Sequence, residues 1–335
     1  MSRDPLVSVI IPTYNRATLL PRALESVLFQ SIDDWEVIVV DDGSIDDTPE
    51  IVRHLAPSFG GRLVYERQSN RGSSAARNRG IDLARGRFVC FLDSDDEFVP
   101  NKIERQLTLF SQRPELGLVY SDFLAKGIDG ESLGCAFDRN CRVARSVSTT
   151  SVGDGLFVCG DDMFSSLLSS YFIATIVGMV RRDVLGETIR FEESASYAEE
   201  WLFYLTVVRA CAVGFVDEPL SIHHHTSGSV TRTDTFQNVA GAYSIVRRVA
   251  SVFRQLTPVQ RRHLHREMAR TALQMGYDTS RRGRPRDAVR YYREAFAHEK
   301  SWHTGRALVS GLWQAASRSL ATGEPMVDTS SGGKA

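Results

Sequence analysis

The chain has 335 residues, of which 42% are hydrophobic, so it can bury a large core in one domain or in two to three smaller ones. Its 40 Lys and Arg nearly balance its 41 Asp and Glu, which gives a formal net charge of −1. Taken over the whole chain, this balance does not indicate a nucleic acid or an anionic membrane as a bulk electrostatic partner.

Strands and helices are predicted to alternate over the first hundred residues. The strands are nearly continuous apolar runs, as expected where both faces of a parallel sheet are covered. We expect strands at 7–12, 35–40, 63–66 and 87–92, with helices at 18–28, from 47 onward and at 73–84. This alternation predicts an α/β fold with a doubly wound, mostly parallel sheet that binds ligands at the carboxyl ends of its strands.

The pattern weakens after residue 110 and changes again near residue 235. A helix at 101–110 and a strand at 118–123 precede a Gly-, Ser- and Thr-rich stretch, 125–160, that is predicted as a long loop or irregular insertion. Helices at 164–171 and 199–209 and a short strand at 212–216 follow. Arg-rich amphipathic helices are then expected at 236–255, 258–279, 285–298 and 302–320, before a disordered tail at 323–335.

Polar motifs follow the first two predicted strands. Pro12-Thr13-Tyr14-Asn15 offers backbone groups and a polar aromatic ring to a base or ribose, although an ordinary strand-to-helix turn would look similar. Asp41 and Asp42 can accept hydrogen bonds from a nucleobase or from ribose hydroxyls, and a helix-capping turn is the alternative.

A third motif opens the helix at 73–84. Arg71 and Gly72 form a turn into the helix N-terminus, and Arg77 and Asn78 lie one turn further on. A helix N-terminus with nearby arginines suits a diphosphate. The alternative is that Arg77 and Asn78 belong to a solvated helix face.

The fourth motif is the most informative one. An apolar strand ends in Asp93-Ser94-Asp95-Asp96, and three carboxylates at a strand exit repel one another unless a cation or sugar hydroxyls compensate them. Mn²⁺ or Mg²⁺ takes carboxylate oxygens and also bridges phosphate oxygens.

The segments PTYN, VVDDGS, NRGSSAARN and FLDSDD, in this order and spacing, resemble the nucleotide-sugar domain of glycosyltransferase family 2, with a GT-A-type fold, over roughly residues 6–230. The resemblance implies Asp42 at the base, Asp95 at the ribose and Asp96, with Asp93, at a divalent metal. The implied nucleotide-sugar set is Pro12, Thr13, Tyr14, Asn15, Asp41, Asp42, Arg71, Gly72, Arg77, Asn78, Asp93, Ser94 and Asp95, and the implied metal set is Asp95, Asp96 and His225.

The resemblance also implies a general base. Glu199-Glu200 corresponds to the family's later acidic pair, so Glu200 is the candidate that deprotonates the acceptor hydroxyl. Glutamate in place of the usual aspartate adds one methylene. A solvated first turn of a helix is the alternative, and Glu192 and Glu193 are nearby competitors that do not match the motif.

The three consecutive histidines at 223–225 resemble the family segment that carries a histidine near the metal or the diphosphate. His225 is the candidate, with His224 as the alternative. An independent zinc site is not expected, because adjacent residues rarely converge on one metal.

Residues 1–235 are therefore predicted to form the glycosyltransferase domain, with a nucleotide-sugar half (1–110) and an acceptor half (111–235), followed by a helical region (236–322). The predicted reaction is inverting, metal-dependent transfer from a UDP-, dTDP- or GDP-linked sugar to a hydroxyl of a saccharide or lipid-linked glycan, in polysaccharide, cell-envelope glycan or glycoconjugate synthesis. The alternative is an inactive nucleotide-sugar-binding scaffold that acts through its helices. Phospho-receiver and phosphohydrolase folds also place acids after apolar strands. A phospho-receiver would leave the segment from Glu199 to Ser229 unexplained, and in a phosphohydrolase the strand with the nucleophilic aspartate normally opens the domain.

The predicted location is cytoplasmic. No stretch approaches the ~20 apolar residues of a membrane span, and no signal-peptide pattern opens the chain. Five cysteines without a CxxC pair indicate free thiols, with a Cys135–Cys141 bridge as the alternative. For the helical region, self-association and peripheral contact with the inner face of a membrane both remain open. No nucleic-acid partner is expected.

Overall fold

The computed structural model describes residues 4–137, 146–195, 197–226 and 235–322. The chain divides into two compact units, Met1–Thr233 and Asp234–Ala335. We call them the sheet unit and the helical unit. The division falls close to the boundary expected at residue 235.

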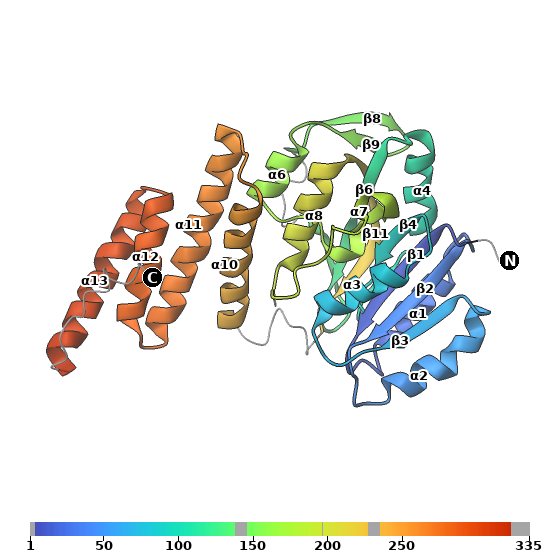
Figure 1. The fold of residues 1–335 in the computed structure, drawn as a ribbon, viewed down its shortest axis with the longest axis horizontal. Coiled ribbons are helices and arrows are strands. Elements are labelled where there is room, and N and C mark those ends of the chain that lie inside the picture. Colours follow the sequence, from blue (N-terminus) through green and yellow to red (C-terminus); the bar gives the residue numbers. More distant parts are fainter. Residues whose placement is uncertain (1–3, 138–145, 196, 227–234, 323–335) are drawn as a thin grey trace. The chain divides into compact units, whose positions relative to one another are not determined.

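Four parallel strands form the first half of the sheet in the sheet unit, in the order β3-β2-β1-β4. Their bounds are Val7–Thr13 for β1, Trp35–Asp41 for β2, Leu63–Arg67 for β3 and Phe88–Phe91 for β4. The helices between them are α1 (Leu20–Leu28), α2 (Thr48–Leu55, extended by the 3₁₀ turn η1, Ala56–Phe59) and α3 (Ser73–Leu83). Right-handed crossovers place α1 and α2 on one face and α3 on the other (Figure 1). This half confirms the predicted α/β alternation.

The second half of the sheet is mixed. Strand β10 (Met179–Arg181) lies antiparallel between β4 and β6 (Leu116–Lys126), and β6 pairs in parallel with β11 (Ala212–His224). Strand β11 is longer than the short strand predicted there and carries His223 and His224. The remaining short elements are β5 (Glu97–Phe98), α4 (Lys102–Gln112), α6 (Met163–Ser169), η3 (Thr175–Val177), α7 (Arg182–Leu185) and α8 (Glu199–Ala210).

The prediction of a loop over 125–160 is wrong for much of that segment. It contains β7 (Ser132–Cys135), β8 (Thr149–Gly153) and β9 (Leu156–Cys159), and β9 pairs antiparallel with β11. Strands β8 and β9 form a hairpin whose turn contains Asp154 and Gly155, both at positive φ. Asp-Gly between β-forming residues favours a tight hairpin turn, so the glycine content indicated a turn rather than an irregular loop.

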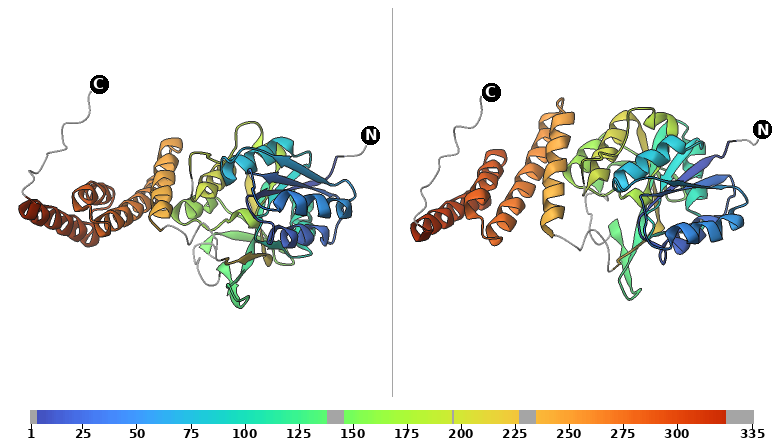
Figure 2. Two further views of the ribbon diagram at one scale, coloured as in Figure 1. Left: turned by 90° about the horizontal axis from the view of Figure 1, so that it is seen from below. Right: turned by 60° about the horizontal axis from the view of Figure 1, so that its bottom comes forward.

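The helical unit contains α10 (Thr235–Val252), α11 (Pro258–Arg281), α12 (Pro285–His298) and α13 (Trp302–Thr322), close to the four predicted bounds. Successive helices lie side by side and run in opposite directions (Figures 1 and 2). Their small core centres on Tyr292, whose ring lies where a side chain at Gly276 or Gly311 would have to fit. These two glycines therefore let α11 and α13 approach α12 closely.

None of the helices that the structure describes is long and apolar enough to cross a membrane. The four described cysteines, Cys90, Cys135, Cys159 and Cys211, are free thiols. Cys141 lies outside the described residues, so the alternative bridge to Cys135 stays untested. The tail predicted at 323–335 also lies outside them.

Candidate active site

A cleft of about 780 Å³ opens at the carboxyl ends of the parallel strands. All four polar motifs contribute to its lining, as expected where parallel strands end at one edge of a sheet. The predicted residues that line it are Pro12, Thr13, Tyr14, Asp42, Arg71, Gly72, Arg77, Asp93, Ser94, Asp95, Asp96 and Glu200. Four predicted residues are not in this lining: Asn15, Asp41, Asn78 and His225.

Asp42 builds the turn that precedes α3. Its Oδ1 accepts hydrogen bonds from Gln68 Nε2 (2.8 Å) and the Arg71 N–H (2.9 Å), and its Oδ2 accepts one from the Gly72 N–H (2.7 Å). Gly72 has a φ of 91°, a backbone conformation that glycine adopts without a steric penalty. The carboxylate therefore fixes the loop that carries the N-terminus of α3 to the cleft.

Three of the residues outside the lining hold neighbouring loops in place. Asp41 is fully buried and accepts a hydrogen bond from the Tyr65 hydroxyl at 2.5 Å. Asn15, at a φ of 53°, accepts a backbone N–H of the adjacent loop at 2.8 Å. Asn78 bonds both the N–H (2.8 Å) and the carbonyl oxygen (3.0 Å) of Phe191. Their predicted contacts with a nucleotide stay predictions, since these side chains are engaged with the protein itself.

Arg77 joins three distant segments beneath the cleft. Its Nη2 donates to Asp93 Oδ1 (2.8 Å) and its Nη1 to Glu199 Oε1 (3.0 Å), while the Thr175 hydroxyl donates to Asp93 Oδ2 (3.0 Å). Burial alone would raise the pKa of Asp93, but the guanidinium and these hydrogen bonds lower it. Arg77 is therefore a buried cation shared by two carboxylates, not part of a solvated helix face. Sequence reasoning missed the roles of Glu199 and Thr175.

Glu200 lies in the first turn of α8, after Ala198, which has a left-handed φ of 60°. The Tyr171 hydroxyl donates a hydrogen bond to Glu200 Oε1 at 2.6 Å. Burial, and next the negative charge of Glu199, raise the pKa of Glu200 to about 7. A carboxyl that titrates near neutrality is suited to general base catalysis. Sequence reasoning did not identify Tyr171.

The competing acid Glu193 also lines the cleft but is already paired. Its Oε2 lies 2.6 Å from Arg71 Nη2, and its Oε1 accepts a hydrogen bond from Asn78 Nδ2 at 3.0 Å. Glu192 is not in the lining. Among the acids of this segment, Glu200 is therefore the one that combines cleft exposure with a raised pKa.

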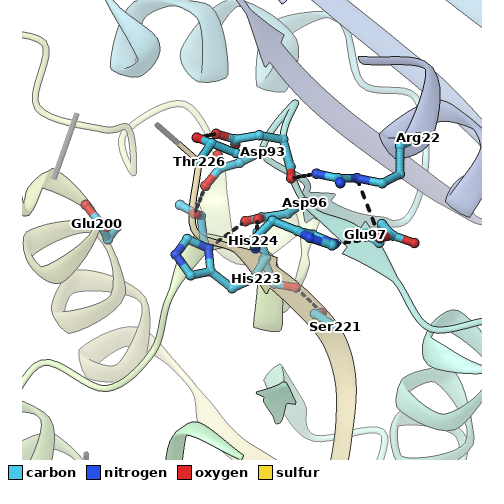
Figure 3. A network of polar contacts seen from close by, with 12 residues as sticks. Arg22, Asp93, Asp96, Glu97, Glu200, Ser221, His223, His224 and Thr226 are labelled. Atoms are coloured by element: carbon cyan, nitrogen blue, oxygen red, sulfur yellow. Dashed lines mark hydrogen bonds and ion pairs between the residues drawn. The ribbon is translucent and has the colours of Figure 1, made fainter. Parts of the chain in front are cut away.

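The acids after β4 meet the histidines at the end of β11 (Figure 3). Asp96 is fully buried; its Oδ2 lies 3.1 Å from His223 Nδ1, and its Oδ1 accepts the His224 N–H at 2.9 Å. Burial would lower the pKa of His223, but the hydrogen bond and charge of Asp96 raise it to about 9. The pair is best described as a carboxylate beside an imidazolium. Glu200 lies apart from this cluster in the same view.

The histidine that lines the cleft is His223, whereas the residue proposed from the resemblance was His225. His223 Nδ1 faces Asp96, so its Nε2 is turned away from that carboxylate. His224 Nε2 lies 2.5 Å from Glu97, and His225 donates its backbone N–H to the Lys126 carbonyl. The geometry therefore favours His223, rather than His224 or His225, as the histidine near a metal or a diphosphate.

A divalent metal fits this donor set only in part. Among the described residues, no group of three or more Asp, Glu, His or Cys side chains is arranged to hold a metal ion. Mg²⁺ is commonly bound through one or two carboxylates together with substrate phosphates and water, so a cage made by protein alone is not required. Asp95 lines the cleft and is 18% exposed, with Thr226 Oγ1 3.3 Å from its Oδ2, so it can take part in such a site.

The parallel strands, the loop that carries the N-terminus of α3 and the acid cluster after β4 define a GT-A-type nucleotide-sugar fold. The solved structures agree with this class. Staphylococcus aureus TarS 1–349 in complex with UDP-GlcNAc has a TM-score of 0.67 at 18% identity, over 96% of this chain and 93% of that one. The mannosyltransferase PcManGT from Pyrobaculum calidifontis, in complex with GDP-Man and Mn²⁺, has a TM-score of 0.58 at 20% identity, over 96% and 82%.

Residues 8–132 match the family model "Glycosyl transferase family 2". A PGL/p-HBAD biosynthesis glycosyltransferase of Mycobacterium bovis is 37% identical over 135 residues, which are 40% of this chain and 52% of the relative. An uncharacterized glycosyltransferase of Rickettsia felis is 29% identical over 242 residues, 72% of this chain and 36% of the relative. The chain thus spans about half the length of the mycobacterial relative.

Proposed function

We propose that this chain transfers a sugar from a nucleotide-diphosphate sugar to an acceptor hydroxyl, with inversion at the anomeric carbon. The observation that carries the proposal is that one cleft is lined both by the acids after β4 and by Glu200, a carboxyl with a pKa near 7 on a separate element. Inversion requires a base on the face of the sugar opposite the leaving group, and two separate groups of acids meet that need.

The nucleotide is placed against the strand ends in this proposal. Tyr14 is 43% exposed and offers its ring to the base, while Asp95 faces the ribose. The diphosphate lies near Gly72 and the N-terminus of α3, where backbone N–H groups and the helix dipole favour negative charge. Arg71 adds a positive side chain at the same edge.

Asp95 and Asp96 would hold Mn²⁺ or Mg²⁺ together with diphosphate oxygens, and His223 is better placed than His225 to assist them. When bound, the metal supplies positive charge to the departing nucleotide diphosphate. Among the solved structures, PcManGT is described in complex with Mn²⁺. The protein's own part in the reaction is to orient the sugar and to accept the acceptor's proton on Glu200.

We propose an acceptor in cell-envelope glycan, polysaccharide or glycoconjugate synthesis, such as a saccharide or a lipid-linked glycan. The name of the mycobacterial relatives, PGL/p-HBAD biosynthesis glycosyltransferase, supports this class. UDP-, dTDP- and GDP-linked sugars are all candidate donors, since solved relatives in fold hold UDP-GlcNAc or GDP-Man.

A donor screen followed by one variant tests the proposal. The melting temperature of the wild-type protein should rise when one class of nucleotide sugar is added in the presence of Mn²⁺. Addition of an acceptor should then release the nucleotide. Glu200→Gln should lower transfer by about 10²–10⁴-fold while it retains the donor-induced thermal shift. Glu187→Gln, an exposed acid away from the cleft, is the matched control.

Two results would count against the proposal. Full turnover by Glu200→Gln would show that Glu200 is not the general base. Donor binding by the wild type, without transfer or hydrolysis for any donor, would favour the inactive-scaffold alternative. Asp96→Ala should weaken both the rate and its dependence on added metal; an EDTA-insensitive wild type would contradict the metal assignment.

A further inference from the structure

The near-zero net charge of the chain conceals two oppositely charged regions. Residues 1–234 carry 34 Asp and Glu against 23 Lys and Arg, a formal charge of −11. Residues 235–322 carry 16 Lys and Arg against five Asp and Glu, a formal charge of +11. Such an asymmetry points to an anionic partner for the basic part, which the balance over the whole chain did not indicate.

The positive charge of the helical unit lies on its surface. Of the five acids in residues 235–322 only Asp287 is exposed, and Asp287, Glu267 and Glu294 are each within ion-pair distance of an arginine. Every arginine of this unit whose burial is described is exposed, as is Lys300. These arginines are Arg247, Arg248, Arg254, Arg261, Arg262, Arg266, Arg270, Arg281, Arg282, Arg284, Arg286, Arg290, Arg293 and Arg306. The excess of exposed cations over acids is therefore large.

One helix of this unit also exposes large apolar side chains. In α13, Trp302 is 84% exposed, Val309 67% and Trp313 70%, and Arg306 is exposed between them. Their spacing of four, three and four residues puts them on one face of the helix. We call this face the tryptophan stripe. Gly311 lies on the opposite face and packs against Tyr292 of α12.

We propose that the tryptophan stripe of α13 binds the headgroup region of a lipid bilayer that contains anionic lipids. Tryptophan favours the membrane interface because its ring is apolar and its N–H is polar. An interfacial helix combines such rings with arginine on its exposed side, and α13 contains no acidic residue. Arg306 and the other exposed arginines of the helical unit then supply the electrostatic attraction to negative headgroups.

Other partners fit these observations less well. A nucleic acid would use the arginines but leave exposed Trp302, Val309 and Trp313 without an apolar environment. A second copy packed on the same stripe would bring together two stretches of residues 235–322, each with a formal charge of +11, which opposes self-association. The combination of apolar stripe and basic surface therefore favours an anionic lipid surface.

The position of the four tryptophans allows a direct test with the full chain. Trp35 and Trp201 are 1% and 4% exposed, so Trp302 and Trp313 should dominate any fluorescence response to lipid. Vesicles of two parts phosphatidylcholine to one part phosphatidylglycerol should shift the emission to shorter wavelength, and brominated lipids should quench it. Vesicles of phosphatidylcholine alone should bind much more weakly, and high salt should reverse the binding.

Cosedimentation of variants with the same vesicles locates the contact. Trp302→Ala/Trp313→Ala should bind at least about tenfold more weakly, and Arg306→Glu should bind several-fold more weakly. The matched control is Phe29→Ala, which removes a ring that is 67% exposed in the acidic sheet unit and should leave binding unchanged. Unchanged far-ultraviolet circular dichroism shows that the variants are folded.

Several outcomes would overturn this proposal: no partition into anionic vesicles, equal binding to neutral ones, or wild-type binding by the double tryptophan variant. A dimer that the double variant dissociates would assign the stripe to a second copy, and binding to an oligonucleotide without binding to vesicles would assign the basic surface to nucleic acid. The donor-induced thermal shift should persist in the double variant, so a failed lipid test does not affect the proposed transferase function.

Discussion

Asp42 and Asp93 on one side of the cleft are better compensated by hydrogen bonds and positive charge than Glu200 on the other side. On the strand-end side, Asp42 accepts hydrogen bonds from Gln68 and two backbone N–H groups, and Asp93 receives Arg77 and Thr175. On the α8 side, Glu200 receives the Tyr171 hydroxyl but stands beside the negative Glu199, and its pKa rises to about 7. Compensated acids shape the cleft, whereas an acid that is poorly compensated is available for proton transfer.

The largest expected change is in the free energy of unfolding, when the cation shared by Asp93 and Glu199 is removed. Arg77→Met leaves the buried Glu199 and the half-buried Asp93 without their shared cation, which should lower the free energy of unfolding by about 3–5 kcal/mol. Urea titration measures this change. Arg79→Met is the matched control in the same helix, because its ion pair with Glu66 is exposed and should contribute less than about 1 kcal/mol. Equal losses in the two variants would mean that Arg77 does not compensate these acids.

A smaller change in the free energy of unfolding, of opposite sign, is expected for Glu200→Gln. The folded pKa of Glu200 lies above its ordinary value of 4.5, so its contribution to stability is present below pH 4.5 and is lost as the pH rises through about 7. At pH 8 the amide should therefore increase the free energy of unfolding by roughly 1–3 kcal/mol, and by less at pH 5.5. Melting temperatures at both pH values, with Glu187→Gln alongside, measure the difference. A variant that is less stable than the wild type at pH 8 would contradict this explanation.

The smallest effect tests the phenol itself. Tyr171→Phe removes a hydrogen bond that lowers the pKa of Glu200, so the acid limb of the pH–rate profile should move upward by roughly 0.5–1 pH unit. Tyr65→Phe removes a similar phenol bond, to Asp41, and should leave that limb in place. If both variants lose rate equally at every pH, Tyr171 is only structural.

The first half of the fold could be predicted because β1, β2 and β4 are buried along their whole length and are therefore mostly apolar, with polar residues such as Ser8 and Glu36 as exceptions. The segment of β7–β9 gave no such pattern. Strand β8 is largely exposed, so its Thr and Ser residues resemble those of a loop, and β-propensity depends on what each strand packs against. Strand β10 has only three residues, too few for a periodic pattern.

The site was predictable to a similar degree. Acids at strand ends could be assigned to the cleft because parallel strands end at one edge, but their partners come from far along the chain, as Glu199 does for Arg77. The choice of His225 among the three histidines stays a prediction, although His223 is the one that lines the cleft. Register shifts on either side of Pro219 change which face of β11 each later residue occupies, and these irregularities cannot be counted from the sequence.

The end of β11 carries two successive histidines that meet two successive acids: His223 meets Asp96, and His224 meets Glu97. Because neighbouring side chains in a strand point to opposite faces, sliding β11 by one position would exchange the faces and separate both pairs at once. These two contacts therefore fix the register of β11 at the end that borders the cleft. Deleting one residue beside Pro219 should be tolerated far less well than deleting one from the β8–β9 turn, although both are single-residue changes in the same sheet.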